Sequence, residues 1–343
     1  MLSWCIRVHT SEAECIRKKL LRFGVLDRTL RVVRVGDMVI FPLTPEKLDK
    51  IPVDLRDRID RFDFDEREGR KGDYRKYLTF HESLISLLPR SFDIIGDIAV
   101  IKLPSELLRY RTEIGEAMMR AHPNVKSVVL DRGIKGGMRI MDLEIIAGEE
   151  RTETVHTEYG LRFMLDLRKA YFNPRLATER KRIATLTNPK EIVIDMFAGV
   201  GPYSIAIGKF AKPRTLYAID INPDAIHYLM KNVALNAISK VVPICEDARK
   251  AIRDLPMADR IVMNLPHSAM EFISDALSKL ELMGTLHTYF IAERIENNKT
   301  AEAILNKCHH DGYRTEILRC EELKTYSPSM SVFSLDIRLL DWL

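Results

Sequence analysis

The chain has 343 residues, of which 46% are hydrophobic and 30% charged, and its formal net charge is +4. This length leaves room for two or three domains with a substantial core. The sequence contains no run of 18 or more apolar residues and no signal-peptide pattern, so we expect a cytoplasmic protein without a membrane span. Its five cysteines are scattered and form no C-x-x-C pair, which argues against a zinc site or a disulfide framework.

Residues 1–60 are expected to form a small α+β module. A short apolar strand precedes a helix that a capping box of Ser11 and Glu14 would start. The apolar run 30–41 then reads as a hairpin with its turn at Gly36. A strand, a helix and a hairpin together suffice for a small domain.

The next two segments are expected to be a linker and a second α+β domain. Residues 61–77 are densely charged without an apolar period, which is typical of a linker that orders on a partner. Residues 78–169 alternate between strand and helix patterns and finish in a hairpin around Gly160. We expect this second domain to bind RNA.

A strip of positive charge lies between residues 161 and 190, with eight basic side chains against two acids. The aromatic residues Tyr171 and Phe172 lie within it. Such a strip can bind the phosphates of a nucleic acid. A solvated basic helix face explains the same composition equally well.

Residues 170–343 are expected to form a Rossmann-like α/β domain. The apolar strand 192–194 runs into Asp195, and a loop with Gly199 and Gly201 follows it before a helix begins. The next apolar strand ends in Asp220, where an acid can accept both hydrogens of a ribose diol. The pattern predicts an adenosine-containing cofactor at the carboxyl ends of a parallel sheet.

The glycine loop favours S-adenosylmethionine over a dinucleotide. Ser204 stands where a dinucleotide loop has its third glycine, and Asp195 would repel a pyrophosphate but suits the ammonium of a methionine moiety. The last expected strands, 313–320 and 332–339, give the antiparallel finish of a seven-stranded methyltransferase sheet rather than of a dehydrogenase.

A second motif follows the expected strand that ends at Met263. It reads Asn264-Leu265-Pro266-His267 and resembles the Asn-Pro-Pro-Tyr signature of methyltransferases that modify base nitrogens, with His267 in place of the aromatic residue that stacks on the target base. Asp247, after an earlier strand, is placed either to accept from the adenine amino group or to cap a helix, and both roles are compatible.

The whole chain resembles the archaeal and eukaryotic tRNA (guanine37-N1)-methyltransferase family, and most closely its archaeal type. The resemblance rests on residues 171–180, 195–202, 220–223 and 264–266. It implies a class I, Rossmann-like, seven-stranded methyltransferase domain with two smaller N-terminal α+β domains. It also implies methyl transfer from S-adenosylmethionine to N1 of guanosine 37, and contacts with the anticodon loop and the elbow of tRNA. The sequence does not fix the oligomeric state, and a monomer is the default expectation.

The resemblance also implies roles for individual residues. It makes Glu179 the base that removes the N1 proton, Arg139 the partner of O6, and Asn264 a holder of the guanine. Glu179 could instead pair with a neighbouring arginine along a helix, and Arg139 could be a solvated strand residue. The expected cofactor-binding residues are Tyr171, Arg175, Asp195, Phe197, Gly199, Gly201, Asp220, Ile221, Asp247, Asn264 and Pro266; no metal site is expected.

Two other functions stay open at this point. One is a sister enzyme that modifies a wyosine intermediate at position 37 by methyl or aminocarboxypropyl transfer. The other is a noncatalytic tRNA-binding protein with the same fold, against which the retention of Asp195, Asp220, Asp247 and Asn264 argues.

Overall fold

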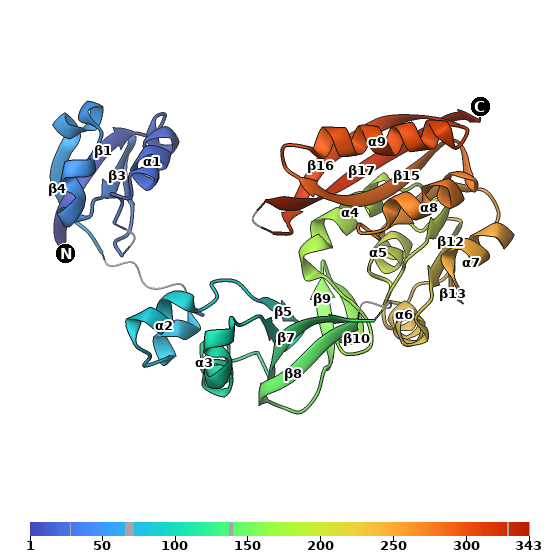
Figure 1. The fold of residues 1–343 in the computed structure, drawn as a ribbon, viewed down its shortest axis with the longest axis horizontal. Helices are drawn as coiled ribbons and strands as arrows, with labels where there is room; N and C mark the ends of the chain where they lie inside the picture. The colour runs from blue at the N-terminus through green and yellow to red at the C-terminus, as the bar shows by residue number, and fades with distance from the viewer. Residues whose placement is uncertain (28, 66–71, 137–139, 328, 343) are drawn as a thin grey trace. The chain divides into compact units, whose positions relative to one another are not determined.

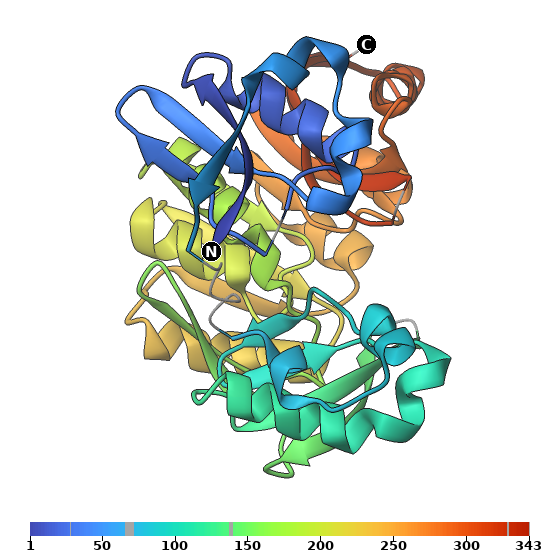
Figure 2. The same cartoon turned by 90° about the vertical axis from the view of Figure 1, so that its left-hand side faces the viewer.

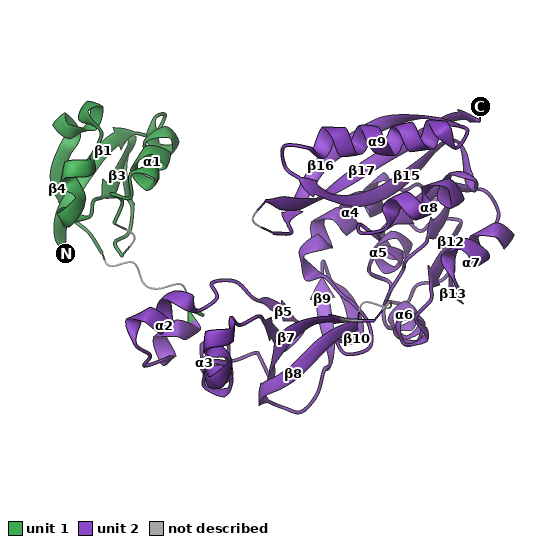
Figure 3. Ribbon diagram, in the orientation of Figure 1, with its two compact units in different colours: residues 1–73 green, residues 74–343 purple. Residues whose placement is uncertain are grey.

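The computed structural model describes residues 1–343 except 28, 66–71, 137–139, 328 and 343. The chain forms two compact units, residues 1–73 and residues 74–343 (Figures 1 and 3). Within the described part of the chain, no helix combines the length and the apolar character that crossing a bilayer requires.

The first unit is a four-stranded sheet with one helix packed on it. Its strand order is β2-β3-β1-β4, and all pairs are antiparallel. Figure 2 shows the ribbon of this unit from a second side. Ile16 and Leu20 of the helix share a core with Ile6 and Val8 of the first strand. The elements are β1 (Leu2–His9), α1 (Ala13–Arg22), β2 (Val33–Val35), β3 (Met38–Pro42) and β4 (Ile59–Asp63).

The structure corrects two expectations about this part of the chain. The capping box does not form, because the Ser11 hydroxyl bonds to the His9 ring at 2.8 Å and no side chain caps α1. The expected linker 61–77 is shorter at both ends. Strand β4 extends to Asp63 and pairs with β1, and Tyr74 is buried in the core of the second unit.

The second unit begins with a four-stranded sheet of order β5-β6-β7-β8. Helix α3 packs on one face of this sheet, and the separate hairpin of β9 and β10 packs on the other through Phe163 and Ile98. The elements are α2 (Glu82–Leu87), β5 (Asp93–Ile95), β6 (Ile98–Ile101), α3 (Arg111–Ala121), β7 (Ser127–Lys135), β8 (Ile140–Gly148), β9 (Glu153–Glu158) and β10 (Leu161–Asp166).

The remaining strands form one seven-stranded sheet of order β13-β12-β11-β14-β15-β17-β16. Only β17 runs antiparallel to its neighbours, which confirms the methyltransferase-like finish. The strands are β11 (Ile192–Asp195), β12 (Thr215–Asp220), β13 (Val241–Cys245), β14 (Ala258–Met263), β15 (Leu280–Glu293), β16 (Tyr313–Thr325) and β17 (Met330–Trp342).

Helices cover both faces of this sheet, because successive side chains of its central strands point in opposite directions. Val193 packs with α4, α5 and α6, whereas Ile194 packs with α7, α8 and α9. The first of these cores also contains Phe163 and Ile98, so the sheets of the second unit share one core. The helices are α4 (Ala177–Leu186), α5 (Pro202–Phe210), α6 (Pro223–Leu235), α7 (Ala248–Ala251), α8 (Ala269–Leu277) and α9 (Asn297–His310).

The structure contains one long strand that the sequence analysis did not predict. Strand β15 pairs with β14 on one side and with β17 on the other, so it joins the parallel strands to the antiparallel finish. Its sequence is interrupted by Met283 at φ 65° and by Gly284, which break the strand pattern near its start. Tertiary pairing therefore overrides a weak local signal.

Candidate cofactor and acceptor site

The glycine loop lies at the carboxyl end of β11, and its two glycines have different tasks. Both adopt left-handed backbone angles, with φ of 56° at Gly199 and 90° at Gly201. A Cβ on Gly201 would lie 2.3 Å from Leu229 Cδ1, so this glycine is required by the packing of α5 on α6. A Cβ on Gly199 would meet nothing closer than the Tyr171 carbonyl oxygen at 3.8 Å. The space beside Gly199 is therefore free for a ligand.

Asp220 ends the neighbouring strand β12 and holds this loop. Its Oδ2 accepts the Gly199 backbone N–H at 2.7 Å, and its Oδ1 accepts the Asn222 N–H at 2.9 Å. Burial raises the pKa of the carboxyl, and the backbone hydrogen bonds oppose that shift. Each carboxylate oxygen has a second lone pair, so Asp220 can still accept hydrogens from a ligand on the cavity side.

Asp195 lies behind the cavity wall rather than on it. Its side chain is fully buried, and Oδ2 accepts the Ser204 hydroxyl at 2.7 Å. Oδ1 has no hydrogen-bond partner among the described residues. Burial raises the pKa of this carboxyl to about 7. The structure thus gives Asp195 and Ser204, which stands at the third glycine position, a shared packing role.

The Asn264-Leu265-Pro266-His267 segment follows β14 and forms the next part of the cavity wall. The Asn264 side chain is half-buried, and no hydrogen bond joins it to any residue that the structure describes. The His267 ring is exposed and meets the Tyr326 ring at a centroid distance of 5.5 Å. An amide with spare donors and acceptors beside a pair of aromatic rings is suited to hold a base.

The third part of the wall comes from the residues before the glycine loop. Tyr171 and Asn173 line it together with Arg180, whose guanidinium is buried and ion-paired with Glu158. Arg180 also lies 5.3 Å from the centre of the Phe172 ring. The basic strip is therefore only partly a solvated face, because this arginine is structural.

The expected site residues divide into three groups. Those on the cavity wall are Tyr171, Phe197, Gly199, Asp220, Ile221, Asn264 and Pro266. Those that the cavity wall does not include are Arg175, Glu179, Asp195, Gly201 and Asp247. Arg139 lies outside the described residues.

Two members of the second group have other partners in the structure. Arg175, in the turn before α4, donates from Nε to Asp93 of strand β5 at 2.7 Å. Asp247 accepts the Arg249 N–H at 2.9 Å, so its helix-capping role is present. The sequence could locate both residues near strand ends but could not give the directions of their side chains.

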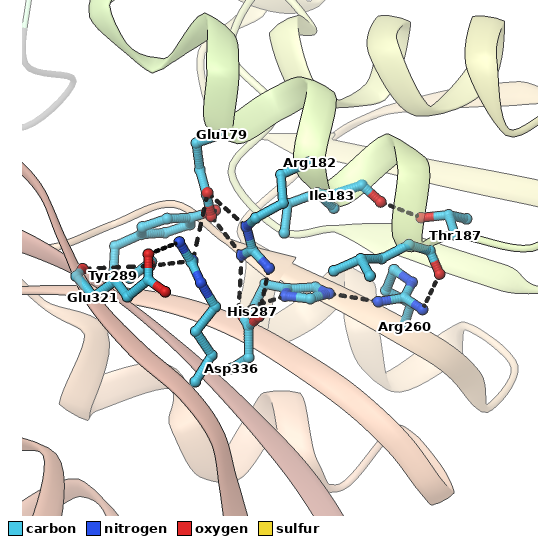
Figure 4. Close-up of polar contacts among 12 residues, drawn as sticks. Glu179, Arg182, Ile183, Thr187, Arg260, His287, Tyr289, Glu321 and Asp336 are labelled. Carbon is cyan, nitrogen blue, oxygen red and sulfur yellow. Dashed lines mark hydrogen bonds and ion pairs between the residues drawn. The ribbon is translucent and has the colours of Figure 1, made fainter.

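Glu179 faces a buried polar network on the sheet instead of the cavity (Figure 4). Its two carboxylate oxygens accept from Arg182 at 2.7 Å each, and Oε1 also accepts the Tyr289 hydroxyl at 3.1 Å. Arg182 in turn donates to Asp336 of β17 at 2.7 Å. Pairing along the helix, which the sequence left open for Glu179, is therefore present.

The network continues from Asp336 to Arg260 through His287 (Figure 4). His287 Nδ1 lies 2.7 Å from Asp336, and Nε2 lies 2.6 Å from Arg260. A guanidinium only donates, so Nε2 accepts and the ring proton sits on Nδ1, facing Asp336. Burial lowers the pKa of His287, which keeps the ring neutral. Burial raises the pKa of Asp336, but the bonds from His287 and Arg182 outweigh it and hold that pKa below its usual range.

Residues that the sequence did not single out complete the cavity wall. Lys324 comes from the end of β16, Tyr326 directly follows that strand, and Ile291 comes from β15. No motif marks them, because they lie far along the chain from Asn264 and reach it only through the order of strands in the sheet. Among the described residues, no group of three histidine, cysteine or acidic side chains is arranged to hold a metal.

The cavity fits S-adenosylmethionine. Asp220 offers free lone pairs at the position of a ribose diol, and the space at Gly199 allows close backbone approach. Half-buried Phe197 offers an apolar surface to an adenine ring, and Asn264 has no competing hydrogen bond within the described chain. A seven-stranded sheet with this carboxyl edge defines a class I S-adenosylmethionine methyltransferase domain.

Family models match nearly the whole chain. The model of the TRM5/TYW2 methyltransferase domain matches residues 154–317. A model of the TYW2 N-terminal domain matches residues 74–152, and a model of the tRNA methyltransferase 5 N-terminal domain matches residues 5–50. The chain belongs to the TRM5/TYW2 methyltransferase family.

Named relatives cover the chain to different extents. The tRNA (guanine(37)-N(1))-methyltransferase Trm5b of Pyrococcus abyssi is 38% identical, over 98% of this chain and 99% of its own. The solved complex of aTrm5 with tRNALeu is 31% identical, covers 98% of this chain and 99% of that one, and has a TM-score of 0.69. A tRNA(Phe) (4-demethylwyosine(37)-C(7)) aminocarboxypropyltransferase of Methanocaldococcus jannaschii is 35% identical, over 69% of this chain and 92% of its own.

Proposed function

We propose that this protein transfers a methyl group from S-adenosylmethionine to N1 of guanosine 37 in tRNA. The observation that carries the proposal is the single cavity that joins Gly199 and Asp220, which suit the cofactor, to Asn264, which suits a base. The full-length similarity to a guanine37-N1 enzyme supports the choice of acceptor. The wyosine-modifying relative covers only about two thirds of the chain, so it supports the alternative less well.

The cofactor end of the cavity works by hydrogen bonding and shape. S-adenosylmethionine, when bound, supplies a methyl group activated by a sulfonium. In this proposal Asp220 accepts from the ribose hydroxyls, and Phe197 and Ile221 offer apolar surface to the adenine. Tyr171 closes the methionine end beside Gly199. These contacts orient the donor toward Asn264.

The acceptor end must hold guanine and remove its N1 proton. Asn264 holds the base through its unpaired amide, and a nucleotide of the anticodon loop is already unstacked enough to enter the cavity. Family resemblance makes Glu179 the proton acceptor. In the structure this carboxylate is buried and bonded to Arg182, so the assignment requires a shift of the side chain or a water that links it to N1. The resemblance assigns Arg139 to O6.

Substrate recognition involves both units in this proposal. The first unit contacts the tRNA elbow, and the second contacts the anticodon loop with its basic strip. We infer a monomer that works in the cytoplasm, where its tRNA substrate is processed. Gel filtration with light scattering measures the molar mass and so tests whether the protein is a monomer.

The decisive experiment uses two unmodified tRNA transcripts that differ only at position 37. With guanosine 37, we expect a mass gain of one methyl group that maps to N1 of that residue. With adenosine 37, we expect no gain. An unmodified guanosine transcript would contradict the proposal, and activity only on a wyosine intermediate would favour the sister enzyme. Calorimetry measures whether the protein binds S-adenosylmethionine. Either enzyme would bind this cofactor, whereas a noncatalytic protein would bind tRNA but not the cofactor.

A further inference from the structure

The proposed acceptor site lacks the aromatic residue that its motif usually carries. His267 stands at that position, directly after Asn264-Leu265-Pro266. Its ring meets Tyr326 at 5.5 Å between centroids and at an interplanar angle of 69°, which is a T-shaped contact. A T-shaped pair covers at most one face of the Tyr326 ring, so His267 leaves the other face of that ring uncovered.

Tyr326 is both accessible and fixed. It lines the cavity that contains Asn264, yet 53% of its surface is exposed. Its backbone N–H donates to the Met330 carbonyl at 2.8 Å, and the hydroxyl of the preceding Thr325 accepts from Arg294 at 2.8 Å. The backbone that carries the ring is thus held before a ligand binds, so only the side chain loses conformational freedom when a base stacks on it.

The other aromatic residues of the described wall lie elsewhere or are covered. Phe172 is buried under the Arg180 guanidinium, and Phe197 precedes Gly199 in the cofactor loop, where it offers its surface to the adenine in the proposed function. The Tyr171 carbonyl faces the open space at Gly199, which places this residue at the cofactor end. Tyr326 is the accessible tyrosine of the described wall that adjoins the Asn264 segment.

We propose that Tyr326 is the stacking platform for the target guanine, with His267 as its aromatic neighbour. This inference rests on the proposed function and adds the residue that follows β16 to the acceptor site. An extruded base loses its neighbours in the loop, and an aromatic face replaces that lost stacking. The C-terminal hairpin thereby supplies the aromatic group that the Asn264 motif lacks.

Single-turnover methylation at saturating cofactor and tRNA tests the proposal. Tyr326→Ala should slow methyl transfer on the order of 10–100-fold, because fewer bound bases stay stacked in the cavity. Tyr326→Phe keeps the ring face and should restore the rate. Leu318→Ala changes an exposed residue outside the cavity, on the strand that Tyr326 follows, so it serves as the matched control. S-adenosylmethionine affinity should be unchanged in all three variants.

Several results would overturn it. One is a Tyr326→Ala variant as fast as an active wild-type protein. Another is a Tyr326→Phe variant as slow as Tyr326→Ala, since the hydroxyl and not the ring face would then matter. A third is a His267→Ala variant that loses activity while Tyr326→Ala does not. An inactive wild-type protein would instead contradict the proposed function itself.

A binding measurement separates stacking from chemistry. A transcript with 2-aminopurine at position 37 is quenched when that base stacks, so its fluorescence in the complex should be higher with Tyr326→Ala than with the wild-type protein. Equal fluorescence in the two complexes would contradict the stacking role, whether or not methyl transfer occurs.

Discussion

Arg182 and Lys324 are two partly buried cations of the second unit with opposite surroundings. Arg182 lies in the network at helix α4, where it bonds to Glu179 and Asp336 at 2.7 Å. Lys324 lies on the cavity wall, and no carboxylate of the described residues forms an ion pair with it. Burial and the nearby Arg175 lower the pKa of Lys324.

This comparison distinguishes charged groups that stabilise the fold from polar groups that can still bind a ligand. In the network each ionised group has a partner, so its burial is compensated within the protein. On the wall, Asn264 and Lys324 have unused hydrogen-bonding capacity toward the cavity. This distinction matters most for Glu179. Its proposed role as the acceptor of the N1 proton requires access to the cavity, whereas its hydrogen bonds to Arg182 lie in the buried network.

The largest expected effect comes from Glu179→Gln, which keeps the side chain's shape but removes its charge. If Glu179 accepts the N1 proton, the single-turnover rate of methyl transfer should fall about 10²–10⁴-fold while S-adenosylmethionine affinity stays nearly intact. Glu296→Gln, which changes an exposed carboxylate that pairs with Lys299 at 3.3 Å, is the control and should keep its rate. Equal loss of cofactor affinity, or an unchanged rate, would leave Glu179 with a structural role only.

Asp336→Asn tests whether the network stabilises the fold. It removes the charge between Arg182 and His287, and the loss of one partner from a buried pair should lower the free energy of unfolding by about 3–5 kcal/mol. Because the folded-state pKa of Asp336 is depressed, its contribution is present at neutral pH and is lost as pH falls below about 4.

Denaturant unfolding at pH 7 and pH 3 measures this effect. Asp341→Asn changes an exposed carboxylate on the same strand, 3.5 Å from Arg314, and should cost less than about 1 kcal/mol. A network that only positions Glu179 would show the reverse result, with a slow methyl transfer and an unchanged free energy of unfolding for Asp336→Asn.

Asp220→Ala tests the cavity wall itself. The substitution removes the acceptor of two loop N–H groups and of the proposed ribose hydrogen bonds, so S-adenosylmethionine affinity should fall about 100-fold or more. Isothermal titration calorimetry measures the affinity. Asp224→Ala, whose carboxylate pairs with Lys169 at 3.5 Å near the start of α6, is the control. Comparable affinities for the two variants would remove Asp220 from the cofactor site.

Asp195→Asn tests a fully buried carboxylate that belongs neither to the network nor to the cavity wall. Its pKa of about 7 exceeds the unfolded value near 4, so its contribution to stability is full below pH 4 and is lost as pH rises to 7. The wild-type protein should therefore lose about 1.4 kcal/mol per pH unit relative to Asp195→Asn across that range. Guanidinium unfolding of both proteins at pH 5 and pH 7 measures the difference, and parallel pH profiles would contradict it.

Much of the cofactor end could be predicted from the sequence, because its signals are local. Gly199, Asp220 and Asn264 each follow an apolar strand within a few residues, and parallel strands bring their carboxyl ends to one edge. Side-chain direction was less predictable. Asp195 and Asp247 also follow strands, yet packing turned one toward Ser204 and the other toward the start of α7.

The sequence by itself determined the sheet type, the cofactor class and the family, since these depend on short motifs and on apolar periodicity. Only the tertiary structure decided that Arg182 meets Asp336, 154 residues away, and that Tyr326 meets His267. Both contacts depend on the position of β15 and β17 in the sheet. Strand order is set by the burial of a shared core, and no local pattern in the chain encodes it.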